Sequence, residues 1–127
     1  MRKKTVVLVI VLALVGLFVL VGSAVRNNTV KLADKTVVSD LELTNVEDGI
    51  YKGEFSLLPV KAVVQVSVKD HQIQEIKILE HKNGLGEKAE IIIDRVIEKQ
   101  SSDVDKVSGA TVSSKVLLKA IENALVK

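Results

Sequence analysis

A long apolar segment near the N-terminus is the first feature of the hydropathy pattern. No charged residue occurs from Thr5 to Val25, and most of these positions are Val or Leu. About 20 helical residues at 1.5 Å per residue span the roughly 30 Å hydrocarbon core of a bilayer. A basic cluster precedes the segment, at Arg2, Lys3 and Lys4. Because basic ends stay on the cytoplasmic side, residues 1–25 predict one membrane anchor with the C-terminal part outside the cytoplasm.

A cleaved signal peptide is the alternative interpretation of the same segment. Gly22-Ser23-Ala24 offers the small residues that a signal peptidase requires. The apolar run exceeds the roughly 7–15 residues of a signal-peptide core, so we favour an uncleaved transmembrane helix. A buried helix of a soluble domain is not expected, because the segment is apolar on every side.

Residues 26–46 show no sustained periodicity, and polar and apolar side chains mix irregularly along them. The pattern predicts a linker that lifts the following domain off the bilayer, with a short strand at Lys35–Val38. Since the segment holds no Pro- or Gly-rich tract, we expect it to be partly ordered by packing on the domain.

Residues 47–127 carry the periodic patterns of one folded domain. Three strands are predicted at Gly49–Ser56, Lys61–Lys69 and Gln72–Glu80. The second alternates apolar and polar positions with period two, as a half-buried strand does. Its inward positions are Ala62, Val64, Val66 and Val68. A tight turn at residues 70–71 joins it to the third strand, so the three segments predict an antiparallel meander.

The third strand and two following helices complete this pattern. Alternation slips within the third strand, which predicts a β-bulge near Gln74-Glu75. Amphipathic helices are predicted at Lys88–Gln100 and Ser113–Val126, each with apolar residues at i, i+3, i+4 and i+7. The two stripes comprise Ala89, Ile92, Ile93 and Val96, and Leu117, Ala120, Ile121 and Ala124. The expected fold class is α+β, with a β-meander packed on two helices after one N-terminal transmembrane helix.

Composition excludes several functional classes. The chain has no cysteine, which rules out a disulfide framework, an iron–sulfur cluster, a zinc–thiolate site and a thiol nucleophile. Its two histidines, His71 and His81, are not closely spaced, and no metal site is predicted. Aromatic residues make up 2% of the chain, and the charge beyond the N-terminal basic cluster is close to neutral. We therefore expect no nucleic-acid partner.

The stretch Asp105–Ser114 holds the candidate chemistry. Serines at the start of the last predicted helix are good N-cap residues, and a helix N-terminus is a ready anion site. A glycine permits close backbone approach, an alanine adds little bulk, and the hydroxyl groups supply donors. The residues concerned are Ser108, Gly109, Ala110, Thr111, Ser113 and Ser114. On this basis the stretch predicts a phosphate site, with an ordinary helix cap as the alternative.

The heptapeptide Asp105–Thr111 reads Asp-Lys-Val-Ser-Gly-Ala-Thr. It resembles the flavinylation motif Asp-x-x-(Ser/Thr)-Gly-Ala-(Thr/Ser) of the FMN-binding domain family, which includes subunits of the sodium-pumping NADH:quinone oxidoreductase and the Rnf complex. The resemblance implies that FMN is attached through its phosphate to the hydroxyl of Thr111. It also implies that Asp105 belongs to the sequence recognised by a separate, Mg-dependent flavin transferase that uses FAD as the flavin donor.

The resemblance extends over essentially the whole predicted domain. Asp48–Gly53 resembles the opening strand of the family, Asp-Gly-x-Tyr-x-Gly. Gly84, Leu85 and Gly86 resemble its glycine loop, although Lys82-Asn83 stands where Thr-Pro is usual. The resemblance assigns this loop to the flavin ring, where the glycines permit close backbone approach and the leucine gives an apolar contact.

Two further side chains have alternative interpretations. Tyr51 either stacks on the flavin ring or packs as an ordinary core or surface tyrosine. His81 lies beside the glycine loop and is interpreted as a solvated loop residue rather than a flavin contact.

The resemblance and the patterns together predict an electron-transfer flavoprotein rather than a complete enzyme. The sequence shows no nucleophile–base arrangement and no dinucleotide fingerprint. The expected partners are the flavin transferase, membrane or extracytoplasmic electron-transfer proteins, and membrane lipid around the N-terminal helix. The alternatives are a module that binds FMN reversibly as a sensor or store, and a non-redox accessory subunit of a membrane complex.

Overall fold

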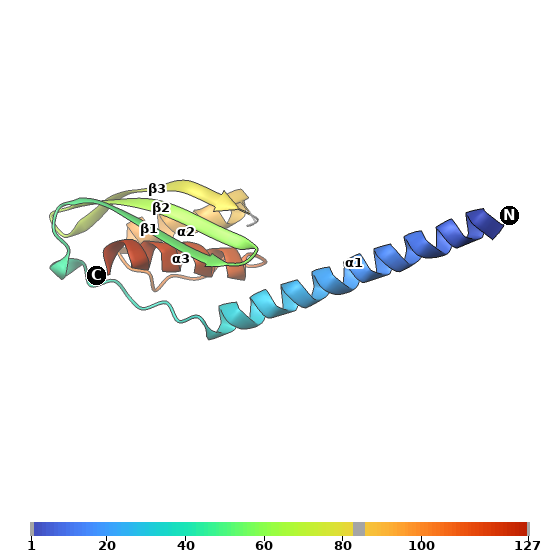
Figure 1. The fold of residues 1–127 in the computed structure, drawn as a ribbon. Helices are drawn as coiled ribbons and strands as arrows, with labels where there is room; N and C mark the ends of the chain where they lie inside the picture. The colour runs from blue at the N-terminus through green and yellow to red at the C-terminus, as the bar shows by residue number, and fades with distance from the viewer. Residues whose placement is uncertain (1, 83–85, 127) are drawn as a thin grey trace.

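The computed structural model describes residues 2–82 and 86–126 of the chain. Figure 1 shows a three-stranded sheet lying over two helices, with a long N-terminal helix extending away from them. The α+β fold class predicted from the sequence is confirmed. In chain order the elements are α1 (Arg2–Lys35), the 3-10 turn η1 (Leu43–Asn45), β1 (Gly49–Leu57), β2 (Val60–Lys69), β3 (Gln72–Lys82), α2 (Gly86–Lys99) and α3 (Thr111–Leu125).

The sheet is the predicted antiparallel meander, with strand order β1-β2-β3. A two-residue turn joins β2 to β3, and its residues Asp70 and His71 have φ values of 52° and 59°. Positive φ at both positions suits the type I′ turn, whose twist matches that of the flanking strands. The Asp70 backbone N–H donates to the Asp48 carboxylate at 2.8 Å, which ties this turn to the start of β1.

Two bulges interrupt the pairing of β2 with β3. Gln74 is the extra residue between the pairs Ser67↔Glu75 and Val68↔Ile73, so the predicted bulge is confirmed. Leu79 is a second extra residue, between the pairs Val63↔Glu80 and Val64↔Ile78, and the sequence analysis did not predict it. Each bulge shifts the in–out alternation of β3 by one position.

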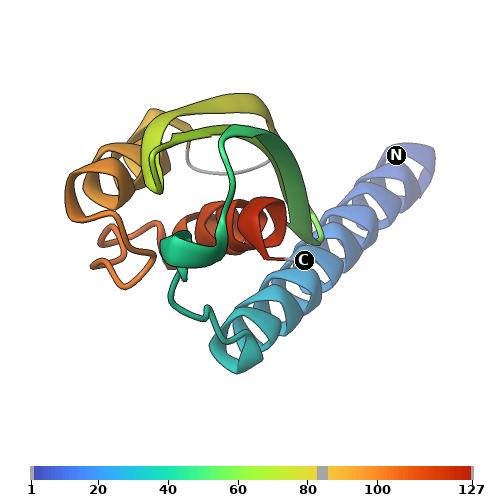
Figure 2. The same cartoon turned by 90° about the vertical axis from the view of Figure 1, so that its left-hand side faces the viewer.

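The core lies between the sheet and helices α2 and α3. Figure 2 shows the sheet arching over α3, with α2 beside it. Gly53 on β1 allows α3 to approach the sheet closely, because a Cβ there would lie 2.5 Å from the Ala124 backbone nitrogen. The predicted inward positions of β2 are buried, as are the described members of both helical stripes. These buried residues are Ala62, Val64, Val66, Val68, Ile92, Ile93, Val96, Leu117, Ala120, Ile121 and Ala124.

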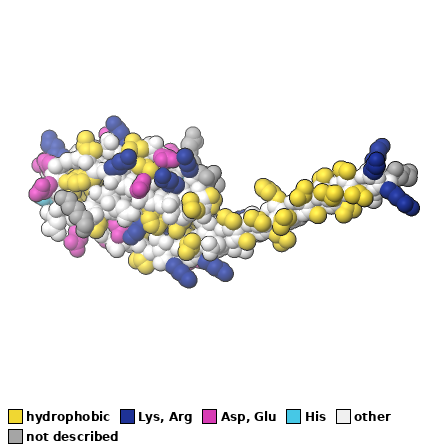
Figure 3. Space-filling view, viewed as in Figure 1, with side chains coloured by type: hydrophobic (Ala, Val, Ile, Leu, Met, Phe, Trp, Pro, Cys, Tyr) yellow, Lys and Arg dark blue, Asp and Glu magenta, His cyan; other side chains and the backbone are white. Residues whose placement is uncertain are grey.

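Helix α1 is longer than the apolar segment that begins it. It continues to Lys35, so the short strand predicted at Lys35–Val38 is wrong. The reason is packing: Thr29 and Ala33, one helical turn apart, are buried against the domain and keep the segment helical. Upstream, the apolar side chains of α1 are exposed, and Figure 3 shows them along its length. This helix is long and apolar enough to cross a membrane.

Residues 36–47, here called the strap, run along the domain instead of forming a free spacer. The Ser39 N–H donates to the Glu122 carboxylate of α3 at 3.2 Å, and the Ser102 hydroxyl donates to the Ser39 carbonyl at 2.7 Å. At the far end of the strap, the His71 ring nitrogen Nδ1 lies 3.2 Å from the Leu43 carbonyl and 3.1 Å from the Val46 carbonyl. The expected packing of the linker on the domain is confirmed by these contacts.

Candidate functional site

The motif segment forms a tight turn whose two apolar residues anchor it in the core. Val107 and Ala110 are buried, and the Ala110 N–H donates to the Val107 carbonyl at 2.9 Å. Between them, Ser108 and Gly109 are exposed. Gly109 has a φ of 78°, which fits the third position of a type II turn and favours glycine. The turn thus presents the exposed Thr111 immediately after a buried anchor.

Helix α3 begins at Thr111, two residues earlier than predicted. Ser113 and Ser114 are therefore not N-cap residues: both are buried within the first turn. The Val107 N–H donates to the Ser114 hydroxyl at 3.2 Å, and this bond holds the motif turn against the helix. Ala110 occupies the N-cap position and gives no side-chain hydrogen bond. The Thr111 hydroxyl thus stands at a helix N-terminus without a side-chain cap, where backbone N–H groups and the dipole favour an anion.

A groove of about 770 Å³ separates this turn from α1. Its domain wall comprises Pro59, Val60 and residues 109–113. Its α1 wall includes Gly22, Val25, Arg26, Thr29, Val30 and Asp34. Arg26 and Asp34 are the charged residues that line it, and its other walls are largely apolar. The volume falls within the roughly 300–1,000 Å³ of small-molecule sites.

Two hydrogen bonds fix the walls of the groove relative to each other. The Thr29 hydroxyl lies 2.7 Å from the Leu58 carbonyl, in the turn between β1 and β2. The Lys115 ammonium donates to the Ala33 carbonyl at 2.6 Å. Helix α1 is therefore held against both the sheet and the first turns of α3.

Other predicted site residues lie apart from Thr111 or outside the described chain. Gly84 and Leu85 lie outside the described residues, and Gly86 is the first residue of α2. Asp105 is exposed, and its backbone carbonyl accepts a 2.6 Å hydrogen bond from Arg95. Tyr51 does not line the groove: its hydroxyl donates to the Glu47 carbonyl at 2.6 Å.

His81 is a correction to the sequence analysis, because its side chain is only 4% exposed rather than solvated. It pairs with Ala62 in the register and so shares the inner face of the sheet. The bulge at Leu79 causes this, since without it the alternation of β3 would place His81 outward. Neither ring nitrogen has a hydrogen-bond partner in the described chain, and the Glu90 carboxylate is 3.9 Å from Nδ1. Buried polar atoms of this kind mark a site for a ligand or an ordered water.

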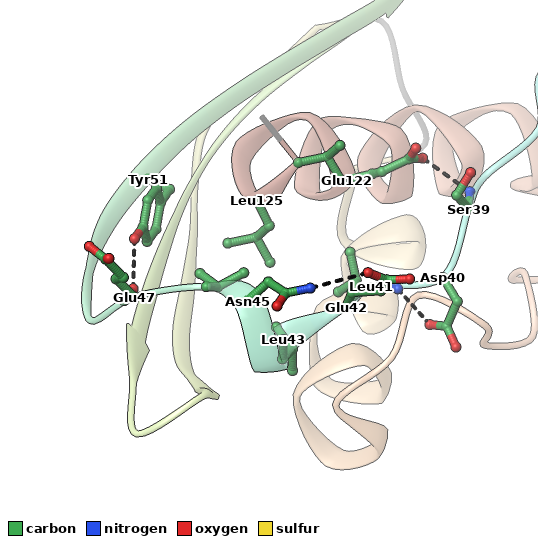
Figure 4. Close-up of a pocket in the computed structure, with 12 residues that line it drawn as sticks. Ser39, Asp40, Leu41, Glu42, Leu43, Asn45, Glu47, Tyr51, Glu122 and Leu125 are labelled. Carbon is green, nitrogen blue, oxygen red and sulfur yellow. Dashed lines mark hydrogen bonds between the residues drawn. The ribbon is translucent and has the colours of Figure 1, made fainter.

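A second cavity, of about 440 Å³, lies between the strap and the end of α3. Figure 4 shows its lining, which includes Tyr51 and the carboxylates of Asp40, Glu42, Glu47 and Glu122. The Ser101 hydroxyl and the Leu41 N–H bind the Asp40 carboxylate and hold its pKa below the usual range. No Lys or Arg side chain of the described chain lines this cavity. Its acidic lining repels a phosphate, so the groove at Thr111 is the better candidate for a phosphate-bearing cofactor.

The Thr111 end of the domain fits a ligand that bears a phosphate group. It offers an exposed hydroxyl at a helix N-terminus without a side-chain cap and an apolar groove beside that hydroxyl. It also holds a buried histidine whose ring nitrogens have no hydrogen-bond partner among the described residues. A search of curated proteins finds no match. A family model described as FMN-binding domain matches residues 58–126, from the end of β1 through α3. That span covers more than half of the chain and contains the motif and Thr111, so the protein belongs to the FMN-binding domain family and has a flavin-binding function.

Proposed function

We propose that the protein carries FMN covalently on Thr111 and transfers electrons between redox partners at the outer face of a membrane. The observation that carries this proposal is the placement of Thr111. Its side chain is exposed at the start of α3, directly after the buried Ala110, in a chain that belongs to a flavin-binding family. A hydroxyl in this place is accessible to another protein and lies where a phosphate is electrostatically favoured.

The attachment step balances as a phosphoryl transfer. The Thr111 oxygen forms a bond to the phosphorus of the FMN half of FAD, and the pyrophosphate bond of FAD breaks. AMP leaves, and the hydroxyl proton is released. The flavin transferase supplies the catalysis, while this chain supplies the recognised turn and the acceptor oxygen. The resulting phosphodiester keeps one negative charge beside the N-terminus of α3.

The rest of the chain holds the cofactor in place. When bound, FMN supplies one- and two-electron chemistry, and the protein sets its position and surroundings. Helix α1 would anchor the domain in the membrane, with its basic N-terminal cluster on the cytoplasmic side. A covalent tether suits the outer face, because a free cofactor would be lost there by dilution, whereas a tethered one keeps a fixed local concentration.

Intact-protein mass spectrometry after denaturation tests this proposal, on full-length protein co-expressed with a flavin transferase. The expected mass increase equals FMN less one water, located on the peptide that contains Thr111. Thr111→Val replaces the hydroxyl with a methyl group and keeps the shape of the side chain, and we expect complete loss of the added mass. Thr111→Ser, the matched control, keeps a hydroxyl and should keep the flavin.

Two results would overturn covalent attachment. If Thr111→Val protein retained stoichiometric flavin after extensive washing, the domain would bind FMN reversibly, as a sensor or store. If wild-type protein stayed colourless and unmodified under conditions that flavinylate a related protein, an accessory, non-redox role would replace it.

A further inference from the structure

Helix α1 shapes the groove beside Thr111 although it lies outside the family match at residues 58–126. The lining positions of α1 recur at one helical spacing, from Gly22 through Arg26 and Val30 to Asp34. Residues four apart lie on the same helix face, so one stripe of α1 faces the motif turn. This half of the groove therefore comes from residues that precede the matched FMN-binding domain.

The stripe carries one positive and one negative side chain, Arg26 and Asp34, at different distances along α1. Arg26 lines one part of the groove and Asp34 another, about 12 Å further along the helix at 1.5 Å per residue. The Arg26 side chain makes no ion pair or hydrogen bond within the part of the chain that the structure describes. It is therefore an available cation in the same groove as the hydroxyl that would bear the phosphate.

The direction of the two helices brings Thr111 toward Arg26 rather than Asp34. Figure 1 shows α3 running in the same general direction as the nearby part of α1. Lys115 of α3 contacts the Ala33 carbonyl, and Thr111 precedes Lys115 by one helical turn. Thr111 therefore lies beside the preceding turn of α1, at Thr29 and Val30, with Arg26 one turn further from Asp34.

We propose that the FMN on Thr111 lies in this groove, with its phosphodiester facing Arg26 and its ring against the valine side chains that line the groove. The inference rests on the proposed function and extends it: α1 is both the anchor and one wall of the flavin site. A charge-assisted contact from Arg26 offsets the remaining negative charge of the phosphodiester. Val25, Val30 and Val60 supply the apolar surface that a flat ring requires.

A single introduced tryptophan tests where the ring lies. The chain has no tryptophan, so a new indole would be the only one present. Val30 lines the groove and is 43% exposed, which leaves room for a larger side chain. In full-length, flavinylated protein in lipid nanodiscs, we expect Val30→Trp to quench the flavin fluorescence several-fold through direct stacking. Val37→Trp, at a 74% exposed position beyond α1, is the matched control and should leave the fluorescence unchanged.

A second variant tests the charge contact independently. Arg26→Gln removes the cation and keeps a side chain of similar length, and we expect it to shift the ³¹P resonance of the phosphodiester. Lys31→Gln removes a cation from α1 outside the groove lining and should not shift it.

The outcomes separate this inference from the proposed function. Each variant is first checked by mass spectrometry for flavin on Thr111. If the flavin is present, but Val30→Trp does not quench it and Arg26→Gln leaves the ³¹P resonance in place, the ring lies elsewhere, as on the glycine loop, and the inference is wrong. If wild-type protein carries no flavin on Thr111, the proposed function fails and the inference fails with it.

Discussion

The strap and the groove lie on two sides of the same domain and differ in how their polar groups are used. Along the strap, Ser39, Asp40 and Glu122 each have a hydrogen-bond partner. Along the groove, Arg26 lacks such a partner within the described residues, and the start of α3 lacks a side-chain cap. Hydrogen-bonded polar groups hold the fold on the strap side, whereas the exposed Arg26 and the uncapped start of α3 are available to a ligand on the groove side. Substitutions on the strap side should therefore change stability, and those on the groove side should change flavin properties.

The largest expected effect comes from the core that both sides share. Gly53→Ala places a Cβ against the Ala120 carbonyl and 2.5 Å from the Ala124 nitrogen, so β1 and α3 must separate. Overpacking of this kind costs about 1–3 kcal/mol or more of unfolding free energy, measured by urea denaturation. In Gly53→Ala the strap side and the groove side should not behave differently, because stability and flavin content are expected to fall together. Gly16→Ala, with no atom within 4 Å of the new Cβ, should leave both unchanged.

The two histidines, His71 beside the strap and His81 in the sheet, test the expected difference between the two sides. His81→Phe keeps an aromatic ring and removes two buried nitrogens that lack hydrogen-bond partners among the described residues. We therefore expect the free energy of unfolding of the flavin-free protein to rise by about 1 kcal/mol in urea denaturation. His71→Phe removes a ring nitrogen within 3.2 Å of two strap carbonyls and should lower stability by a similar amount. An equal loss of stability in both variants would show that His81 stabilises the fold as His71 does, and would contradict the expected difference between the two histidines.

A pair of serines gives a smaller contrast. Ser102→Ala removes a buried hydroxyl that bonds the Ser39 carbonyl, at an expected cost of about 1 kcal/mol and with no change in flavin content. Ser108→Ala changes an exposed hydroxyl of the motif turn and should alter stability by less than about 0.5 kcal/mol. Denaturation curves together with flavin fluorescence measure both quantities. A Ser102→Ala protein of wild-type stability would show that the strap contributes little.

The smallest effect is a pH dependence on the strap side. Bonds from Ser101 and Leu41 hold the pKa of Asp40 below its usual value. Its contribution to stability is present above the unfolded-state pKa of about 4 and is lost as the pH falls through the lower folded-state pKa. Because the group is exposed, the contribution stays below about 1 kcal/mol. Asp40→Asn and Ser101→Ala should both reduce the fall in melting temperature below pH 4. If both variants kept the wild-type pH profile, the Asp40–Ser101 hydrogen bond would not contribute to stability.

Much of the fold could be predicted because burial on one side imposes a period on the sequence. The alternation of Ala62, Val64, Val66 and Val68 defined β2, and apolar spacing defined the stripes of α2 and α3. Turn chemistry located residues 70–71. These signals are local, so a single sequence carries them in full.

The features that were missed depend on contacts between distant segments. Residues 26–35 have no apolar helical stripe in the sequence. Their helix is stabilised by Thr29, which bonds to Leu58, and by Ala33, whose carbonyl accepts a hydrogen bond from Lys115 of α3. The second bulge depends on the pairing of β3 with β2. Because that bulge reverses the face of His81, a local reading of β3 placed the ring in solvent.

The sequence motif names a candidate residue, Thr111, but not the surroundings that the structure gives it. The motif identified Thr111 by residue type and spacing, and the structure places it at the start of α3. Assigning the N-cap to the serines was wrong because Ser114 bonds inward to the Val107 N–H. The sequence did not single out Arg26, because its place in the same groove as Thr111 depends on how α1 docks against α3, across more than 80 residues of sequence.

Helix α1 runs without interruption from Arg2 to Lys35 and is bonded to the domain near its end. No flexible linker therefore separates the domain from the helix, and the two turn together. One residue inserted upstream, for example beside Gly16, would turn the domain by about 100° around the helix axis and move it by only about 1.5 Å along that axis. The rotational orientation of α1 about its axis would then set the direction in which the Thr111 end faces within the membrane plane, and so which neighbouring protein it meets.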